Sequence, residues 1–413
     1  MQTNTLAIDF GTSNSAAALA WEGGVFRVPV EEGAETLPTA VFFPEGGGSM
    51  RIGAKAGAAL VAGDEGRYMR ALKSVLGVPL FHESRLIEGK RRTLADVVAA
   101  FLAKLKARAE AATGQHFSRA LSGRPVRFHS EDAGKDAQAE VDLRGCYLAA
   151  GFDEVEFLAE PEAAAWACAG MGGAEGLGLI VDIGGGTSDF TVFRSEDAGR
   201  IKVLASHGIR LGGTDFDRAI SMAQAMPLLG LGSELRREMG AGLLPVPRAP
   251  FGDLATWAKI PFLYTPETRR MAADLVKFAV EPERLERFAT VLELELGHEL
   301  AFAVERGKIA ANGGAAGEIA MGFITPGLAA GVTAEEMGAA LGVAREALRE
   351  AMGETLALAG VGAGEVARVI LVGGSSLMGL VGEEAEALCP GAAQLRSEAF
   401  TAVVDGLALA ARG

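Results

Sequence analysis

The sequence predicts an α/β protein built from two homologous halves. The main observation is a phrase that occurs twice: an apolar run, an aspartate, a glycine turn with hydroxyl residues, and a second apolar run. The copies are LAIDFGTSNSAAA at residues 6–18 and LIVDIGGGTSDFTVF at residues 179–193. Such runs around a glycine turn are typical of β-hairpins, and the amphipathic pattern at residues 93–112 predicts a helix between them. The repeat is too long for a solenoid, whose units run roughly 20 to 50 residues, so two lobes with a shared cleft are expected.

The turn of each predicted hairpin has the residue types that hold a phosphate. Glycines let the backbone approach a ligand closely, and a turn of exposed N–H groups is a ready site for an anion. The aspartate at the end of each first strand, Asp9 or Asp182, can hold magnesium through water. The paired turns therefore indicate a site for a phosphorylated ligand with a metal.

Composition excludes several classes of function. The chain has 413 residues, enough for two or more domains, and a formal net charge of −14. Nucleic acid and anionic membranes both need a basic face, so neither is expected as a partner. The three cysteines have no metal-ligand or disulfide spacing, and no signal peptide or apolar stretch of about 18 residues is present. We therefore expect a cytoplasmic protein without a membrane span.

Two charged residues stand at the starts of predicted helices. Lys55 begins a helix at residues 54–61, where it could overhang the cleft, and Glu160 directly precedes Pro161 at the start of another. The alternatives are a solvated lysine and a carboxylate that only favours the helix dipole. Position alone does not decide between these interpretations.

Later segments continue the α/β pattern. A turn at Gly212 and Gly213 leads into a helix, and a long helix at residues 294–311 contains alternating charges, which usually mark a solvated face. An apolar strand at residues 367–372 runs into Gly373, Gly374 and Ser375, a third close approach of backbone. The glycine-rich link at residues 170–178 marks a boundary. We predict lobe I at 1–176, with a C-terminal helix at 397–413 packing back on it, and lobe II at 177–396, with an insertion at about 218–312.

Six segments together resemble the ATPase domain of the 70-kDa heat-shock chaperones, the DnaK family, within the actin-like ATPase superfamily. They follow the family's order and span essentially the whole chain: IDFGTSNS (8–15), AEPEAAAWA (159–167), VDIGGGTSDFTVF (181–193), LGGTDFD (211–217), ERGKIA (305–310) and ILVGGSS (370–376). More narrowly, the chain is similar to the short YegD-type members through ALKSVLG (71–77), GRPVRF (123–128), MPLLGLG (226–232) and FTAVVDGLA (400–408).

This resemblance implies an actin-like, ribonuclease H-like fold with ATP or ADP and Mg²⁺ in the cleft. It also implies roles by matched position. The metal would be held by Asp9 and Asp182. The attacking water would be positioned by Glu160, Asp182 and Thr187, and Lys55 would be the catalytic lysine on the γ-phosphate. The nucleotide would be bound by Gly11, Thr12, Ser13, Gly184, Gly185, Gly186, Thr187, Gly212, Gly213, Glu305, Lys308, Asn312, Gly373, Gly374 and Ser375.

The chain departs from the family's pattern in three ways. The lysine motif is shifted, since Lys55 stands in Gly-Ala-Lys-Ala where the family has Gly-x-x-Ala-Lys. Ile309 and Leu377 stand where the family has two arginines that sandwich adenine, which removes a cation–π contribution and predicts weaker, less selective binding. No segment resembles the family's substrate-binding β-sandwich or lid, so we expect no peptide-holding cycle within this chain alone.

The resemblance implies a slowly hydrolysing, ATP-binding chaperone-like protein that acts as a nucleotide switch. One alternative is a nucleotide-binding regulator or pseudo-ATPase with negligible turnover. Another is a small-molecule kinase of the same fold, although no additional aspartate base is evident. A dinucleotide oxidoreductase is disfavoured, because residues 184–186 lack the Gly-x-Gly-x-x-Gly spacing. The sequence identifies neither the protein partner or client nor the oligomeric state.

Overall fold

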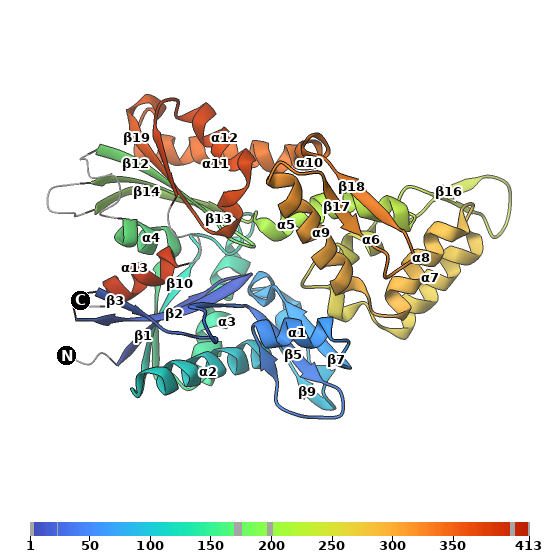
Figure 1. The fold of residues 1–413 in the computed structure, drawn as a ribbon, viewed down its shortest axis with the longest axis horizontal. Helices are drawn as coiled ribbons and strands as arrows, with labels where there is room; N and C mark the ends of the chain where they lie inside the picture. The colour runs from blue at the N-terminus through green and yellow to red at the C-terminus, as the bar shows by residue number, and fades with distance from the viewer. Residues whose placement is uncertain (1–3, 23, 169–175, 196–200, 397–400, 412–413) are drawn as a thin grey trace. The chain divides into compact units, whose positions relative to one another are not determined.

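The computed structural model describes residues 4–22, 24–168, 176–195, 201–396 and 401–411. The chain divides into two compact units, one of Met1–Gly213 with Arg345–Gly413 and the other of Thr214–Ala344. Both main β-sheets belong to the first unit (Figure 1). The lobe boundary predicted at residue 176 therefore does not coincide with the division between the units, and the two-lobe division remains a prediction.

The first unit contains two β-sheets with the same strand order. The first sheet runs β3-β2-β1-β10-β11, with β4 also pairing with β2, and the second runs β14-β13-β12-β19-β20. In each, two antiparallel pairings are followed by two parallel ones. The strands are β1 (Thr5–Phe10), β2 (Asn14–Trp21), β3 (Gly24–Arg27), β4 (Thr36–Pro38), β10 (Arg119–Arg124), β11 (Glu154–Ala159), β12 (Gly176–Ile183), β13 (Ser188–Ser195), β14 (Ile201–Ile209), β19 (Val366–Val372) and β20 (Ala393–Arg396). The repeated sequence phrase therefore corresponds to two sheets with the same arrangement of strands. Both predicted hairpins are confirmed as β1–β2 and β12–β13.

Two helices connect the sheets into one core. Helices α4 (Glu160–Cys168) and α13 (Ala402–Ala410) pack against each other (Figure 1). Their alanines share a buried cluster with Ala7 of the first sheet and Ile180 and Ile370 of the second. A Cβ added to Gly406 would overlap the carbonyl of Ala163, so only glycine allows this backbone contact. The predicted C-terminal helix exists, but residues 397–400 and 412–413 lie outside the described residues.

The remaining elements of the first unit surround these sheets. Thr93 and Asp96 form a capping box at the start of α2, and Gly114 ends it in the left-handed conformation (φ 66°). This confirms the helix predicted at residues 93–112. The elements are β5 (Ala40–Pro44), β6 (Arg51–Ile52), α1 (Ala54–Val61), β7 (Gly66–Arg70), the 3₁₀ turn η1 (Leu72–Val75), the 3₁₀ turn η2 (Pro79–His82), β8 (Arg85–Ile87), β9 (Lys90–Arg92), α2 (Leu94–Thr113), α3 (Ala133–Ala149), α11 (Gly342–Ala359), which begins in the second unit, and α12 (Gly379–Leu388).

The second unit is mainly helical. Lys308 forms a buried ion pair with Asp217 (Nζ–Oδ1 2.6 Å), and Trp257 donates its ring N–H to the same carboxylate (3.1 Å). This network ties α9 to α5. The elements are α5 (Gly213–Ile220), β15 (Glu234–Arg236), β16 (Leu243–Pro245), α6 (Ala249–Leu254), α7 (Pro266–Phe278), α8 (Pro282–Glu293), α9 (Gly297–Asn312), β17 (Gly317–Ala320), β18 (Ala329–Val332) and α10 (Ala334–Ala340). Among the described residues of the whole chain, no helix combines the length and apolarity needed to cross a membrane.

Candidate functional site

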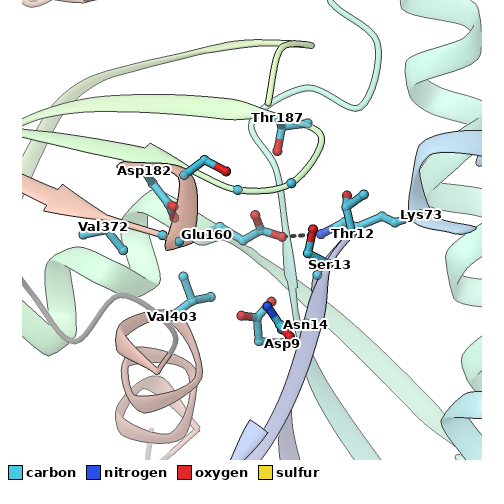
Figure 2. Close-up of a pocket in the computed structure, with 16 residues that line it drawn as sticks. Asp9, Thr12, Ser13, Asn14, Lys73, Glu160, Asp182, Thr187, Val372 and Val403 are labelled. Carbon is cyan, nitrogen blue, oxygen red and sulfur yellow. Dashed lines mark hydrogen bonds and ion pairs between the residues drawn. The ribbon is translucent and has the colours of Figure 1, made fainter. Parts of the chain in front are cut away.

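A polar pocket lies in the first unit, where both glycine turns meet the start of α4. Figure 2 shows it with Glu160 near the centre. Its walls come from both hairpins, from the 3₁₀ turn η1, from the end of β19 and from α13. The lining residues are Asp9, Gly11, Thr12, Ser13, Asn14, Lys73, Glu160, Asp182, Gly184, Gly185, Thr187, Val372, Gly373, Gly374, Ser375 and Val403.

The two glycine turns contact each other at the pocket. A Cβ added to Gly185 would overlap the hydroxyl of Ser13, and one added to Gly186 would lie 2.8 Å from the hydroxyl of Thr12. The second turn is closed by a hydrogen bond from the N–H of Gly184 to the carbonyl of Thr187 (3.0 Å). Glycine is therefore required in the second turn because the first turn occupies the space of a side chain.

Further glycines support these turns. The N–H of Gly213 donates to the carbonyl of Gly184 (3.0 Å), and a Cβ on Gly212 would lie 2.5 Å from the nitrogen of Gly186. Gly373 has a positive φ of 82°, and a Cβ there would lie 2.6 Å from Oδ1 of Asp182. Gly212 and Gly213 thus lie against the second turn, whereas Gly373 reaches the pocket itself.

A buried ion pair crosses the pocket. Lys73 Nζ lies 2.6 Å from Glu160 Oε1, and both residues are buried (Figure 2). Burial lowers the pKa of Lys73, but the carboxylates of Glu160 and Asp9 outweigh this effect and raise it. The lysine is therefore a fixed positive charge inside the site.

The neighbouring aspartates are held in an unfavourable electrostatic environment. Burial, followed by repulsion from Glu160, raises the pKa of Asp9 to about 7. The same two causes raise the pKa of Asp189 to about 8 and that of Asp182 well above its usual range. Asp189 lies opposite Asp182 across the second hairpin. Four carboxylates thus surround one lysine, which leaves an excess of buried negative charge.

Most of the predicted site residues come together here. Asp9, Glu160, Asp182 and Thr187 all line the pocket, as do the predicted glycines and hydroxyls at 11–13, 184–185 and 373–375. Gly186, Gly212 and Gly213 do not line it. Lys55 also lies elsewhere: it is exposed on the first turn of α1, and the lysine in the pocket is Lys73.

The residues predicted to contact the ribose and base lie in α9 of the second unit. Lys308 is engaged by Asp217, as described above, and Glu305 and Asn312 belong to the same helix. Ile309 and Leu377, which replace the family's arginines, are 62% and 40% exposed. Both apolar side chains therefore have surface available for a ligand.

Four lining residues were not predicted as site residues: Asn14, Lys73, Val372 and Val403. A signal existed for Lys73, because it is a single charge among Leu72, Val75 and Leu76 in a short apolar stretch. A lysine with apolar neighbours on both sides is a candidate for burial. Val403 had no comparable signal, since its place depends on the packing of α13 against α4.

Comparison with known proteins identifies the family. The family model described as Hsp70 protein matches residues 5–225. The chaperone protein DnaK of Thermosipho melanesiensis is 34% identical over 220 residues, which are 52% of this chain and 34% of the relative. The HscA homolog of Azotobacter vinelandii is 31% identical over 301 residues, 67% of this chain and 46% of the relative. The chain thus spans less than half the length of these relatives.

The duplicated sheets, the paired glycine turns and the carboxylate pocket define a protein of the actin-like ATPase fold. The chain belongs to the Hsp70 family. Members of this family bind ATP or ADP in their nucleotide-binding domain, and the matched segment at residues 5–225 covers both glycine turns of this chain.

Proposed function

We propose that this chain binds ATP or ADP with magnesium in the pocket described above, hydrolyses ATP slowly and works as a nucleotide switch. The observation that carries this proposal is the meeting of two glycine–hydroxyl turns over a buried lysine and an excess of carboxylates. Phosphoryl transfer needs positioning and charge neutralisation more than covalent help from the protein, and these groups supply both.

The two turns would hold the phosphates. Backbone N–H groups in such turns form anion-binding concavities, and the hydroxyls of Thr12, Ser13 and Thr187 line the same space. Gly11, Gly184 and Gly185 allow phosphate oxygens to come close to the backbone. Gly186, Gly212 and Gly213 would not contact the phosphates, but they would fix the backbone conformation of the second turn.

Magnesium fits the charge of the site. Asp9 and Asp182 would hold it, and it would supply neutralisation of the phosphate charge. Within the described residues, no three His, Cys, Asp or Glu side chains are grouped to ligate a metal directly. This arrangement suits an ion that keeps several of its waters.

The attacking water would be positioned by Glu160, Asp182 and Thr187. We assign the γ-phosphate lysine to Lys73 in place of Lys55, because Lys73 lines the pocket and Lys55 does not. Its ammonium group, held 2.6 Å from Glu160, would stabilise the charge that develops on the transferred phosphate.

On the resemblance alone, Glu305, Lys308 and Asn312 would face the ribose and adenine, and Gly373, Gly374 and Ser375 would lie beneath the base. Ile309 and Leu377 would pack on the base without the cation–π contribution of arginine. We therefore expect weaker binding and less discrimination between ATP and GTP than two arginines would give.

Two other functions remain open, and the output of the switch is unidentified. A pseudo-ATPase would bind nucleotide without turnover, and a small-molecule kinase would transfer phosphate to an acceptor other than water. We expect a protein partner or client and no nucleic-acid or membrane partner. We expect a cytoplasmic protein on its cysteine usage; two of its cysteines, Cys146 and Cys389, are buried free thiols.

The test is magnesium-dependent phosphate release by the purified chain, beside Lys73→Ala and the matched control Lys55→Ala. We expect slow release by the wild type and by Lys55→Ala, and none by Lys73→Ala, with ATP binding retained in all three. Release that stops in Lys55→Ala and continues in Lys73→Ala would reverse the assignment. Binding without release in the wild type would establish the pseudo-ATPase, and phosphate recovered only on an added acceptor would establish the kinase.

A further inference from the structure

The lysine in the pocket belongs to a short segment that begins with an unfavourable backbone conformation. Lys73 belongs to the short 3₁₀ turn η1, which follows Ala71 in the left-handed conformation (φ 60°, ψ 31°). A residue with a side chain pays roughly 1–3 kcal/mol for such a conformation. Inside the segment, the hydroxyl of Ser74 donates to the carbonyl of Ala71 (2.7 Å). The position of Nζ therefore depends strongly on contacts from other parts of the fold.

Residues 125–130, here called the strap, supply one of these contacts. His129 is buried, and its Nε2 lies 2.7 Å from the carbonyl oxygen of Leu76, the residue that ends η1. A carbonyl only accepts, so Nε2 carries the proton and donates. Nδ1 is then the acceptor that faces the guanidinium of Arg210 at 3.5 Å.

Arg210 reaches the same segment. Its guanidinium donates to the carbonyl of Ser74 (2.7 Å), next to Lys73, and its backbone N–H donates to the hydroxyl of Ser130 in the strap (3.4 Å). Arg210 directly precedes Leu211, whose carbonyl accepts from Ser188 at the start of β13. One chain of contacts thus joins the lysine segment, the strap and the second hairpin.

The strap is fixed to the second hairpin at its other end. The N–H of Val126 donates to Oδ1 of Asp189 (2.7 Å). On the neighbouring strand β14, a Cβ added to Gly208 would lie 2.9 Å from the Cβ of Val126 and 2.6 Å from that same Oδ1. Glycine at position 208 therefore lets the strap lie directly on the hairpin that carries the second glycine turn.

We propose that His129 is a positioning residue, which sets the place of Lys73 in the nucleotide site by holding the carbonyl of Leu76, with Arg210 as its partner. The inference rests on the proposed function of the pocket and adds to it. The strap contacts both the segment that carries Lys73 and the hairpin that carries the second glycine turn, and so links them, although they are about a hundred residues apart in sequence. His129 itself does not line the pocket, so its effect passes through Lys73.

The experiment compares His129→Leu, which removes the donor and keeps the bulk, with His129→Gln, which keeps an N–H donor. A small misplacement of a catalytic group can cost up to about 100-fold in rate. We expect His129→Leu to lose about 10-fold or more in kcat while the Kd for ATP changes little, and His129→Gln to recover most of the rate. An unchanged kcat in His129→Leu, a Kd that rises in step with the loss of kcat, or a His129→Gln as slow as His129→Leu would each overturn the proposal.

A second readout does not need turnover. Acetylation of lysines by acetic anhydride, followed by mass spectrometry, reports how well each buried amine is held. Lys106 is the internal control, because it is also buried and paired, with Glu110 at 2.6 Å. In His129→Leu we expect acetylation of Lys73 to rise several-fold relative to Lys106, with no rise in His129→Gln. If the wild type does not hydrolyse ATP, the proposed hydrolysis is wrong. The acetylation of Lys73 relative to Lys106 then decides the role of His129, and a ratio that is unchanged in His129→Leu would overturn the proposal.

Arg210→Met keeps the proposal testable if His129→Leu does not fold. Arg210 is exposed, so its loss leaves the core intact. We expect the same changes in smaller measure: a lower kcat, a nearly unchanged Kd and a higher acetylation ratio for Lys73. Arg91, exposed on β9, provides the matched control Arg91→Met, for which no change is expected. Equal behaviour of the two arginine variants would overturn the inference.

Discussion

Replacing Lys73 by methionine tests the electrostatics of the pocket independently of catalysis. Methionine keeps the length of the side chain and removes its charge, which leaves Glu160 buried without the cation at 2.6 Å. Removing one partner of a buried ion pair typically costs about 3–5 kcal/mol, because the other charge remains uncompensated.

We therefore expect Lys73→Met to lose about 3–5 kcal/mol in the free energy of unfolding at pH 8. Denaturant unfolding at this pH, with EDTA and without nucleotide, measures the loss.

Two further variants make the result interpretable. Lys55→Met changes an exposed lysine and should stay within about 0.5 kcal/mol of the wild type. The double variant Lys73→Met with Glu160→Gln removes both charges and should recover much of the stability lost at pH 8. A Lys73→Met protein as stable as Lys55→Met, or a double variant no more stable than the single one, would refute the reasoning.

Three further predictions concern other parts of the first unit. Asp182→Asn should remove the gain in ATP affinity that magnesium gives, as measured by calorimetry with and without the metal; an unchanged magnesium dependence would contradict the assignment. Gly185→Ala places a Cβ on the hydroxyl of Ser13 and should raise the Kd for ATP about tenfold, or 1.4 kcal/mol, whereas Gly57→Ala, with no atom within 4 Å of the new Cβ, should leave it unchanged. Burial raises the pKa of Glu384, but hydrogen bonds from Arg349 and Arg345 outweigh it and lower the pKa. The stabilisation is then present above the pKa of an ordinary glutamate and is lost as the pH falls through the folded-state pKa. Glu384→Gln should therefore cost roughly 1 kcal/mol at pH 7, since both arginines are partly exposed, and progressively less as the pH falls below the pKa of an ordinary glutamate; a cost that does not change with pH would exclude the ion pairs as its source.

The fold could be predicted because its main feature, a hairpin with a glycine turn, occurs twice and is formed each time by neighbouring residues. A strand, a glycine turn and a second strand form a hairpin from neighbouring residues, so periodicity and turn chemistry suffice. The structure adds what periodicity cannot supply: both hairpins continue into parallel strands, β10 and β11 in one sheet and β19 and β20 in the other. Two of these four pairings, β1 with β10 and β12 with β19, join residues more than a hundred positions apart.

The lysine of the pocket shows where local reasoning stops. Lys55 and Lys73 both follow small or apolar residues, and the resemblance favoured Lys55 by motif. Lys73 is the one that is buried, because Ala71 turns the chain and because His129 and Asp142 hold the backbone at Leu76 and Gly77. Those partners come from separate parts of the chain. Val403 was missed for the same reason, since α13 reaches the pocket by packing on α4 and on strands of the first sheet.

The charge of the site argues that it is shaped by a ligand rather than by stability. Repetition of the same hairpin brings Asp9 and Asp182 to equivalent places, and the start of α4 adds Glu160 between them. Burial, followed by repulsion from Glu160, raises the pKa of Asp9 to about 7 in spite of the nearby charge of Lys73. Folding alone would favour apolar or paired residues at such positions. A group that brings positive charge, such as a metal bound to phosphate, reduces the electrostatic repulsion among these carboxylates. The protein should therefore be stabilised more by ATP with magnesium than by either one added separately.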